Sequence, residues 1–305
     1  MDNEFYSHGK LLITGEYFVL EGSSAFAVPV KLGQSLRVKT FYDKKGEVHW
    51  ETSVKGEPWF QSTFNINNLD IVKTSHLETA YHIKKLLLNI KDKTNIFNEP
   101  DLSLRFAANI EFPLEWGLGS SSSLISNLAQ WANIDPYQLL FDTSKGSGYD
   151  VACARANGPI IYEIIEKPCV KQVEFNPQFL DKVYFVYLGK KQNSLISVEQ
   201  NWESIKALNE EKQRISHITH SIVQSKTLEN FENLLLEHET IISSALKLPS
   251  VKTQLFPDFD GVVKSLGAWG GDFVLATHAG NSDYVMSYFR GKGLDVVFPY
   301  RELVL

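Results

Sequence analysis

Hydrophobic and polar positions along the first third of the chain follow the pattern of β-strands. Residues 11–20 and 25–40 are rich in apolar and β-branched side chains, and a turn that begins at Gly22 separates them. Residues 102–110 show a similar apolar run. We therefore expect the chain to begin with β-structure and to return to it before residue 111.

Other segments show apolar positions at helical spacing. The pattern predicts a helix after Ser75, which is a suitable N-cap, with apolar side chains between residues 77 and 88. Residues 124–132 also place apolar side chains on one helical face. Almost all of residues 196–247 is predicted to be helical, in two or three helices joined by short turns.

The pattern changes past Asp150, where residues 160–165 and 182–189 are predicted to be strands ahead of the long helical region. Strands and helices thus occur in both halves but in different orders, which is typical of an α+β protein. We place the boundary between two domains so that the first covers residues 1–165 and the second residues 166–305.

Charge and composition exclude several classes of protein. The net charge is −6 and the pI about 5.8, without the basic stripe that a nucleic-acid-binding surface needs. The first residues are acidic rather than basic, and no apolar run is long enough to span a membrane. Cys153 and Cys169 are too few for a disulfide framework or a zinc site. We expect a cytoplasmic protein, monomeric or homodimeric, with no nucleic-acid or membrane partner.

The turn of glycines and serines from Gly117 to Ser123 stands between a predicted strand and a predicted helix. Glycines allow the backbone to approach a ligand, and the free N–H groups of a helix N-terminus favour an anion. Serine hydroxyls add donors for phosphate or a ligand for Mg²⁺. A serine that only caps the helix is an equally good interpretation of this turn alone. The chain has no P-loop of the G-x-x-x-x-G-K-[ST] type.

Two further residues have chemistry that suits phosphoryl transfer. Asp150 follows two glycines and precedes an apolar run, so its carboxylate could accept or orient the proton of a hydroxyl group. Lys10 follows Gly9 and could neutralise charge on a moving phosphoryl group. Taken singly, such an aspartate is more often a cap or turn residue, and such a lysine is usually solvated.

Four motifs occur together in one order: SHGKLLITGEYFVLEG from Ser7, GLGSSSS from Gly117, KGSGYDVA from Lys145, and GAWGGDF from Gly267. In order and approximate spacing they resemble those of the GHMP kinases, the family of galactokinase, homoserine kinase, mevalonate kinase and phosphomevalonate kinase. The resemblance extends from Ser7 to about Thr277. It implies an N-terminal domain like ribosomal protein S5 and a ferredoxin-like C-terminal domain.

The resemblance also implies an ATP-dependent kinase that uses Mg²⁺, with Asp150 as catalytic base and Lys10 beside the transferred phosphate. ATP would be bound by Gly117, Leu118, Gly119, Ser120, Ser121 and Ser122. The metal ion would be bound by Ser121 and by Asp142, since the position of the family's metal-binding glutamate is occupied here by Leu139. An anionic small-molecule acceptor would be contacted by Glu16, Tyr17, Lys190, Ser194, Gly270 and Gly271.

The details are most similar to the mevalonate-pathway branch of the family, because the arginine-rich opening of galactokinases is absent. Some features favour phosphomevalonate kinase and others mevalonate kinase, so mevalonate and 5-phosphomevalonate both remain as acceptors. A diphosphomevalonate decarboxylase is a third alternative. A nucleotide or metabolite sensor without turnover is a fourth, although Lys10, Ser121 and Asp150 are all retained.

Overall fold

Two compact units make up the chain in the computed structural model. The described residues are 2–99, 101–189, 205–267, 269 and 271–305. The first unit comprises Met1–Gly9, Leu32–Leu114 and Leu118–Arg155, and the second comprises Lys10–Lys31, Glu115–Gly117 and Ala156–Leu305. The boundary that we expected after residue 165 stays a prediction, because both units draw on several stretches of the sequence.

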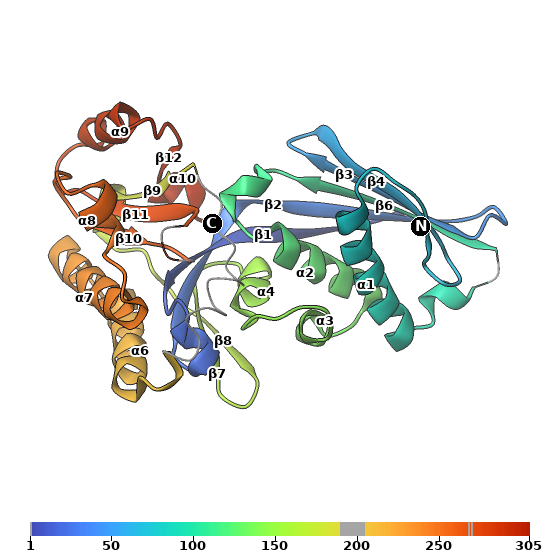
Figure 1. Ribbon diagram of the computed structural model, residues 1–305, viewed down its shortest axis with the longest axis horizontal. Helices are drawn as coiled ribbons and strands as arrows, with labels where there is room; N and C mark the ends of the chain where they lie inside the picture. Colours follow the sequence, from blue (N-terminus) through green and yellow to red (C-terminus); the bar gives the residue numbers. More distant parts are fainter. Residues whose placement is uncertain (1, 100, 190–204, 268, 270) are drawn as a thin grey trace. The chain divides into compact units, whose positions relative to one another are not determined.

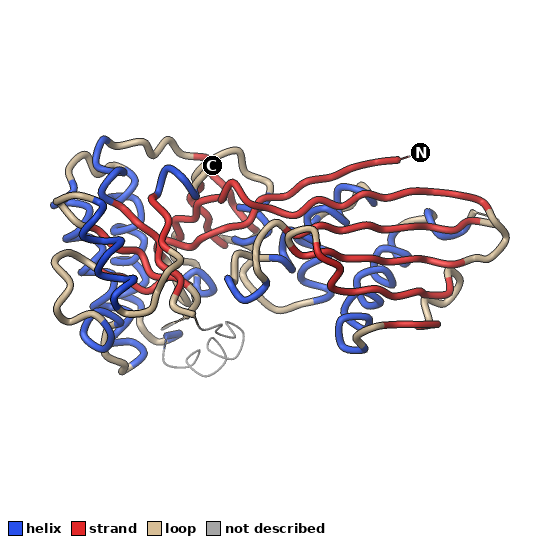
Figure 2. The backbone as a smooth tube through the Cα atoms, turned by 90° about the horizontal axis from the view of Figure 1, so that it is seen from above, coloured by secondary structure: helices blue, strands red, loops and turns tan. Residues whose placement is uncertain are grey.

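The first unit is built on a β-sheet with helices on one face (Figures 1 and 2). Its strands are the first part of β1 (Asp2–Thr14), the later part of β2 (Ala25–Tyr42), β3 (Glu47–Val54), β4 (Glu57–Asn65), β5 (Ile71–Thr74) and β6 (Leu102–Ile110). They are ordered β5-β4-β3-β6-β2, and β1 also pairs with β2. β6 runs antiparallel to β2 and parallel to β3. The strand expected over residues 102–110 is confirmed.

The helices of the first unit close its core. They are α1 (Leu77–Lys93), α2 (Ser120–Ala132), α3 (Pro136–Thr143) and α4 (Tyr149–Ala154), with a short 3₁₀ turn at Ile96–Asn98. A second 3₁₀ turn, Leu114–Trp116, begins in the first unit and continues in the second. Apolar side chains of the sheet, such as Phe64 and Phe106, pack with Leu87 of α1 and Leu128 of α2. The predicted N-cap is wrong by one residue, because the ring of His76, not Ser75, accepts the hydrogen bond from the N–H of Thr79.

The second unit combines a four-stranded antiparallel sheet with helices that pack against it. Its elements are η1 (Phe18–Glu21), β7 (Ile160–Ile164), β8 (Pro168–Gln172), η4 (Gln178–Lys182), β9 (Val183–Tyr187), α6 (Asn209–Val223), α7 (Leu228–Leu246), α8 (Val251–Leu255), β10 (Val263–Ser265), β11 (Phe273–Thr277), α9 (Ser282–Gly291), β12 (Val297–Pro299) and α10 (Tyr300–Leu303). The sheet order is β10-β11-β9-β12. The first part of β2 pairs with β7, which in turn pairs with β8.

The predicted helical region is confirmed where it is described, since α6 and α7 account for most of residues 209–246. Its first part, up to residue 204, lies outside the described residues. The strand expected over residues 11–20 ends early, at Thr14. The chain turns there because Gly15 and Tyr17 take positive φ values of 91° and 63°, which a strand cannot contain. Over the described parts of the chain, no helix combines the length and apolar character needed to cross a membrane.

Candidate functional site

The glycine-serine turn forms the start of helix α2, as the sequence predicted. Gly117 and Gly119 have φ values of 64° and 94°, in the left-handed region that glycine adopts without a steric penalty. Gly119 is the N-cap, and Ser120 begins a helix of 13 residues. Ser121 is exposed and Ser120 partly exposed, so the first turn presents hydroxyl groups at the positive end of the helix dipole. This arrangement suits a phosphate group.

Ser122 and Ser123 lie deeper in the same helix and serve its packing. The Ser122 hydroxyl is buried and donates to the carbonyl oxygen of Gly119, 2.9 Å away. Ser123 is also buried, and its hydroxyl lies 2.7 Å from Oε1 of Gln34 on β2. Ser122 therefore shapes the backbone of the loop, while its predicted contact with ATP stays a prediction.

A buried polar network fixes α2 on strands β1 and β2 within the first unit. The hydroxyl of Ser7 donates to Oδ1 of Asn127 at 2.8 Å, and the hydroxyl of Ser126 lies at the same distance from it. Nδ2 of Asn127 donates to the carbonyl oxygen of Gln34, again at 2.8 Å. Ser7, the first residue of the SHGK motif, is completely buried. The motif thus contributes to the position of the helix that begins at the glycine-serine turn.

Asp150 lies in the first turn of α4, next to its N-cap Gly148, which has a φ value of 89°. Its Oδ1 accepts a hydrogen bond from the N–H of Val151 at 3.1 Å, and the residue remains partly exposed. Helices α2 and α4 pack against each other in the first unit. The acid is therefore held on a helix that packs against α2, the helix that follows the glycine-serine turn.

Lys10 approaches the same turn within the second unit, since its Nζ donates to the carbonyl oxygen of Gly117 at 3.1 Å. Asp272 lies on another side of this glycine, and a Cβ atom built on Gly117 would be 1.8 Å from Oδ2 of Asp272. The first and last of the four sequence motifs thus meet at Gly117. Asp272 is the aspartate of the GAWGGDF motif, and no contact between it and Gly117 was predicted from the sequence.

The residues proposed to bind metal differ in their surroundings. Ser121 is exposed at the start of α2, whereas the Asp142 carboxylate is 2.7 Å from Nζ of Lys93 and accepts a hydrogen bond from Asn89. These two contacts lower the pKa of Asp142. Leu139 is fully buried in the core. Among the described residues, no three His, Cys, Asp or Glu side chains are close enough to hold a metal ion.

Glu16 and Tyr17, which we expected to face the acceptor, are both buried. One carboxylate oxygen of Glu16 is 2.5 Å from Nζ of Lys264, and the other is 3.2 Å from Nε2 of His238. The hydroxyl of Tyr17 accepts a hydrogen bond from the N–H of Trp269 at 2.8 Å. Their contact with an acceptor stays a prediction.

Sequence reasoning missed the partners of Glu16. Lys264 sits in a three-residue strand, and His238 and Glu239 lie within a long amphipathic helix. The available signal was a lysine and a glutamate at positions where the spacing of apolar residues predicts a buried side chain. Such residues are rarely buried without a partner, so each of them indicates a buried ion pair. Gly271 is described and buried, whereas Lys190, Ser194 and Gly270 lie outside the described residues.

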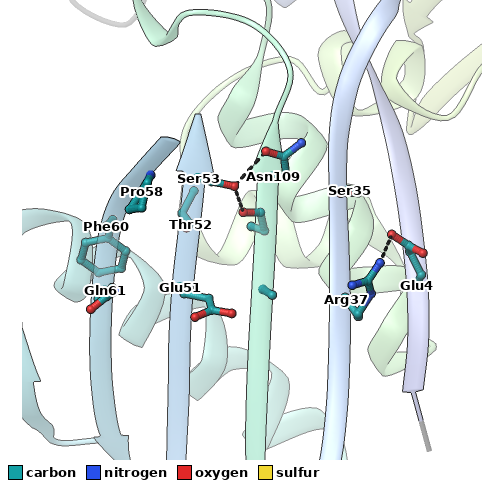
Figure 3. Close-up of a pocket in the computed structure, with 12 residues that line it drawn as sticks. Glu4, Ser35, Arg37, Glu51, Thr52, Ser53, Pro58, Phe60, Gln61 and Asn109 are labelled. Carbon is teal, nitrogen blue, oxygen red and sulfur yellow. Dashed lines mark hydrogen bonds and ion pairs between the residues drawn. The ribbon is translucent and has the colours of Figure 1, made fainter. Parts of the chain in front are cut away.

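A shallow hollow of about 420 Å³ lies on the first unit's sheet (Figure 3). Glu51, Ser53 and Asn109 are among its lining residues, and the ion pair of Arg37 with Glu4 lies at one side. The side chains that line it are mostly those of a solvated sheet face. None of the residues that we predicted to be catalytic lines this hollow, so it does not define the candidate site.

No protein-family model matches the chain, and no curated protein matches its sequence. Solved structures match nearly all of it. The mevalonate kinase of Methanococcus jannaschii is 17% identical with a TM-score of 0.68, over 98% of this chain and 97% of that one. The Streptococcus pneumoniae phosphomevalonate kinase, in complex with phosphomevalonate and AMPPNP, is 16% identical with a TM-score of 0.71, over 97% and 99%. The Lactococcus lactis galactokinase complexed with galactose is 15% identical with a TM-score of 0.61, over 97% and 92%.

The chain has the GHMP kinase fold. The mixed α and β architecture predicted from the sequence is confirmed by this match. These identities are low, so the likeness concerns the fold alone. The residues of this chain whose chemistry suits phosphoryl transfer are those at the start of α2, Lys10 and Asp150.

Proposed function

We propose that the protein is an ATP-dependent kinase that phosphorylates a small anionic alcohol. The observation on which this rests is the start of α2, where two left-handed glycines lead into a long helix with an exposed Ser121. The free N–H groups of such a turn bind phosphate oxygens, and the helix dipole adds to the attraction. The GHMP kinase fold supports ATP as the anion, since a neighbour of that fold was solved with AMPPNP.

In this proposal Lys10 stabilises the charge of the phosphoryl group during transfer. Its hydrogen bond to Gly117 holds the ammonium group at the loop before any nucleotide binds. A preorganised charge of this kind does not have to reorient as the transition state forms, which is why it lowers the barrier. Asp150 accepts or orients the proton of the acceptor hydroxyl, a role that suits its partly exposed carboxylate.

Mg²⁺ would neutralise phosphate charge during transfer. Kinases usually bind it through one or two protein groups and the phosphates themselves. The exposed hydroxyl of Ser121 fits that requirement. Asp142 would serve as a second ligand only after its carboxylate left Lys93 and Asn89.

For the acceptor we propose mevalonate or 5-phosphomevalonate. The resemblance of the sequence motifs to the mevalonate-pathway branch supports this, as do the mevalonate kinase and phosphomevalonate kinase among the similar structures. Gly271 and the segment that contains Lys190 and Ser194 are proposed to face the acceptor.

We also propose that the protein acts in the cytoplasm. A nucleotide or metabolite sensor of the same fold and a diphosphomevalonate decarboxylase are the alternatives.

A coupled assay of ADP release tests the proposal, with Mg²⁺-ATP and mevalonate, 5-phosphomevalonate, 5-diphosphomevalonate, homoserine or galactose. We expect turnover on one of the first two acceptors, and a loss of at least about 100-fold in the Asp150→Asn variant with ATP binding retained. Asp283→Asn is the matched control, because Asp283 is also an acid in the first turn of a helix but is exposed on α9.

The other outcomes have separate meanings. ATP binding without turnover on any acceptor would favour a sensor, and turnover on 5-diphosphomevalonate with release of CO₂ would favour the decarboxylase. Equal losses in Asp150→Asn and Asp283→Asn would contradict the role of Asp150.

A further inference from the structure

Four ionisable side chains meet in the interior of the second unit: Glu16, His238, Glu239 and Lys264. Their exposed fractions are 3%, 0%, 4% and 1%. Nζ of Lys264 is 2.5 Å from Oε1 of Glu16 and also donates to the carbonyl oxygen of Ser265 at 2.7 Å. The N–H of Ser265 donates to Oε1 of Glu239 at 3.3 Å. A buried cluster of this kind is costly unless its charges balance.

The charges of this cluster do not balance if both glutamates are ionised. The ring of His238 is neutral, since its Nε2 accepts a hydrogen bond from the N–H of Gly15 at 3.0 Å and burial lowers its pKa. Lys264 is then the cluster's one cation, and it can neutralise one carboxylate. Within the described residues, Oε2 of Glu16 and Oε2 of Glu239 are both buried without a hydrogen-bond partner. One additional proton on a carboxylate would remove the excess negative charge.

We propose that Glu239 is the carboxylate that keeps this proton, and that it acts through Lys264 and Glu16 as a positioning residue for the backbone next to Gly117. The role in positioning rests on the proposed function, whereas the protonation of Glu239 stands on the geometry of the cluster. Glu239 itself would contact neither the nucleotide nor the acceptor. Its effect reaches the loop through the contacts of Glu16.

Burial is the main cause that raises the pKa of Glu239, to about 7. Lys264 and the N–H groups of Ser265 and Val251 oppose the rise, while Glu16 adds to it. Burial also raises the pKa of Glu16, but there the opposing effects of Lys264 include a direct hydrogen bond. Lys264 therefore favours an ionised Glu16, which leaves Glu239 as the residue that holds the proton.

The groups that face Glu239 come from four neighbouring elements. Lys264 lies on β10, Glu16 lies just after β1, and His238 precedes Glu239 on α7 itself. α8 contributes the N–H of Val251, and its charged residue Lys252 instead donates to the carbonyl oxygen of Gly261. Glu237, the nearest acid in the sequence, is paired with Arg214 on α6. The titration of Glu239 thus depends chiefly on burial, Lys264 and Glu16.

Glu16 connects this cluster with the glycine-rich segment that reaches Gly117 through Asp272. The N–H of Gly267 hydrogen-bonds to the Glu16 carboxylate, and the adjacent Tyr17 accepts the hydrogen bond from Trp269. Asp272, at the end of the same segment, packs on Gly117. When Glu239 loses its proton, its carboxylate competes with Glu16 for Lys264. The link from Glu16 to Gly267 is then weakened, and the backbone next to Gly117 loses support.

The sign of the pH effect follows from the raised pKa. Below pH 4.5, the ordinary value for glutamate, Glu239 is protonated in the folded and unfolded states alike. Between that pH and about 7 only the folded state keeps the proton, so the stability of the folded state falls as pH rises through this window. Above it the contribution is lost completely. Glu239→Gln keeps the shape and an acceptor oxygen but cannot ionise.

The test compares the wild type, Glu239→Gln and Glu237→Gln between pH 6 and 8.5. Glu237 is the matched control because it is a glutamate two residues away on α7 whose pKa is lowered by its hydrogen bond with Arg214. The melting temperature of each protein is measured alone, and the Kd for Mg²⁺-AMPPNP is measured by calorimetry. Titration of the nucleotide's own phosphates is common to all three proteins, so only differences between them are interpreted.

From pH 6 to 8.5, the Kd of the wild type and of Glu237→Gln should each rise at least about fivefold more than the Kd of Glu239→Gln does. Without nucleotide, the melting temperature of the wild type should fall relative to that of Glu239→Gln as pH rises. Parallel Kd profiles in all three proteins would overturn the role in positioning. Parallel melting temperatures would overturn the protonation of Glu239. Absence of nucleotide binding in every protein would overturn the proposed function, and the melting temperatures would still decide the protonation.

Discussion

The carboxylate of Asp272 lies against the Cα atom of Gly117, so that a Cβ atom added to this glycine would be 1.8 Å from Oδ2. Real Cβ contacts are never this short, and Gly117 also has a φ value of 64°. The same glycine accepts the hydrogen bond from Lys10 through its carbonyl oxygen. The backbone of the loop is therefore fixed from two directions at a residue that has no room for a side chain.

Gly117→Ala is expected to weaken the binding of Mg²⁺-ATP by at least about tenfold, because either Asp272 or the loop must move. Calorimetry measures the change. Gly56→Ala is the matched control, since Gly56 also has a positive φ, of 84°, but has open space where the Cβ atom would lie. Gly56→Ala has the same backbone cost of roughly 1 kcal/mol, but its new methyl group meets no other atom. Equal affinity in Gly117→Ala and Gly56→Ala would contradict the importance of this contact.

Lys10→Met is expected to lower kcat at least about 100-fold while changing the Kd for ATP much less, because its charge matters most during transfer. Steady-state kinetics and calorimetry separate the two effects. Lys31→Met provides the comparison, since Lys31 also donates to a backbone carbonyl, that of Arg301 at 2.7 Å, in the same unit. A loss of affinity for ATP with unchanged kcat would show that Lys10 contributes to ATP binding and not to phosphoryl transfer.

Ser121→Ala is expected to raise several-fold the Mg²⁺ concentration that gives half-maximal activity, because a ligand oxygen is removed. Titration of Mg²⁺ at saturating ATP measures this. Asp142→Asn distinguishes two possibilities for the second ligand. A similar shift would identify Asp142 as that ligand, and an unchanged requirement would show that its carboxylate serves only Lys93 and Asn89.

Asn127→Leu is expected to reduce the free energy of unfolding by about 2 kcal/mol or more, because the Ser7 hydroxyl and the Gln34 carbonyl each lose a buried partner. Urea denaturation followed by circular dichroism provides the measurement. Ser121→Ala should leave this free energy nearly unchanged, since Ser121 lies on the same helix but is exposed. Comparable losses in the two variants would show that the network contributes little.

The sequence was sufficient to predict elements with strong periodicity or special backbone residues. Strand Leu102–Ile110 and the helix after Gly119 were predicted correctly, because apolar spacing and glycine act within a few residues of the chain. The end of β1 was missed, since apolar residues stand on both sides of Gly15 and Glu16 in LLITGEYFVL, and the turn shows in the positive φ of Gly15 and Tyr17. A positive φ at a tyrosine depends on tertiary packing that local pattern does not show.

The candidate site was predicted through motifs, but its contacts were not. Ser121, Asp150 and Lys10 were identified by residue type and order, whereas the pairing of Glu16 with Lys264 joins residues 248 positions apart. The apolar residues around Lys264 in the sequence hint that it is buried, but they do not identify Glu16 as its partner. Burial and partner choice are properties of the folded chain, so their effects on ionisation become visible only in the structure.

The network of Ser7, Gln34, Ser123 and Asn127 also has an evolutionary consequence. Two pairs of side chains satisfy each other, Ser7 with Asn127 and Ser123 with Gln34, so a change at one member of a pair leaves the other with an unmet hydrogen bond. Substitutions within each pair should therefore be accepted together rather than singly. In descendants of this chain, replacement of Ser123 by alanine should be accompanied by an apolar residue at position 34, whatever acceptor the protein has come to use.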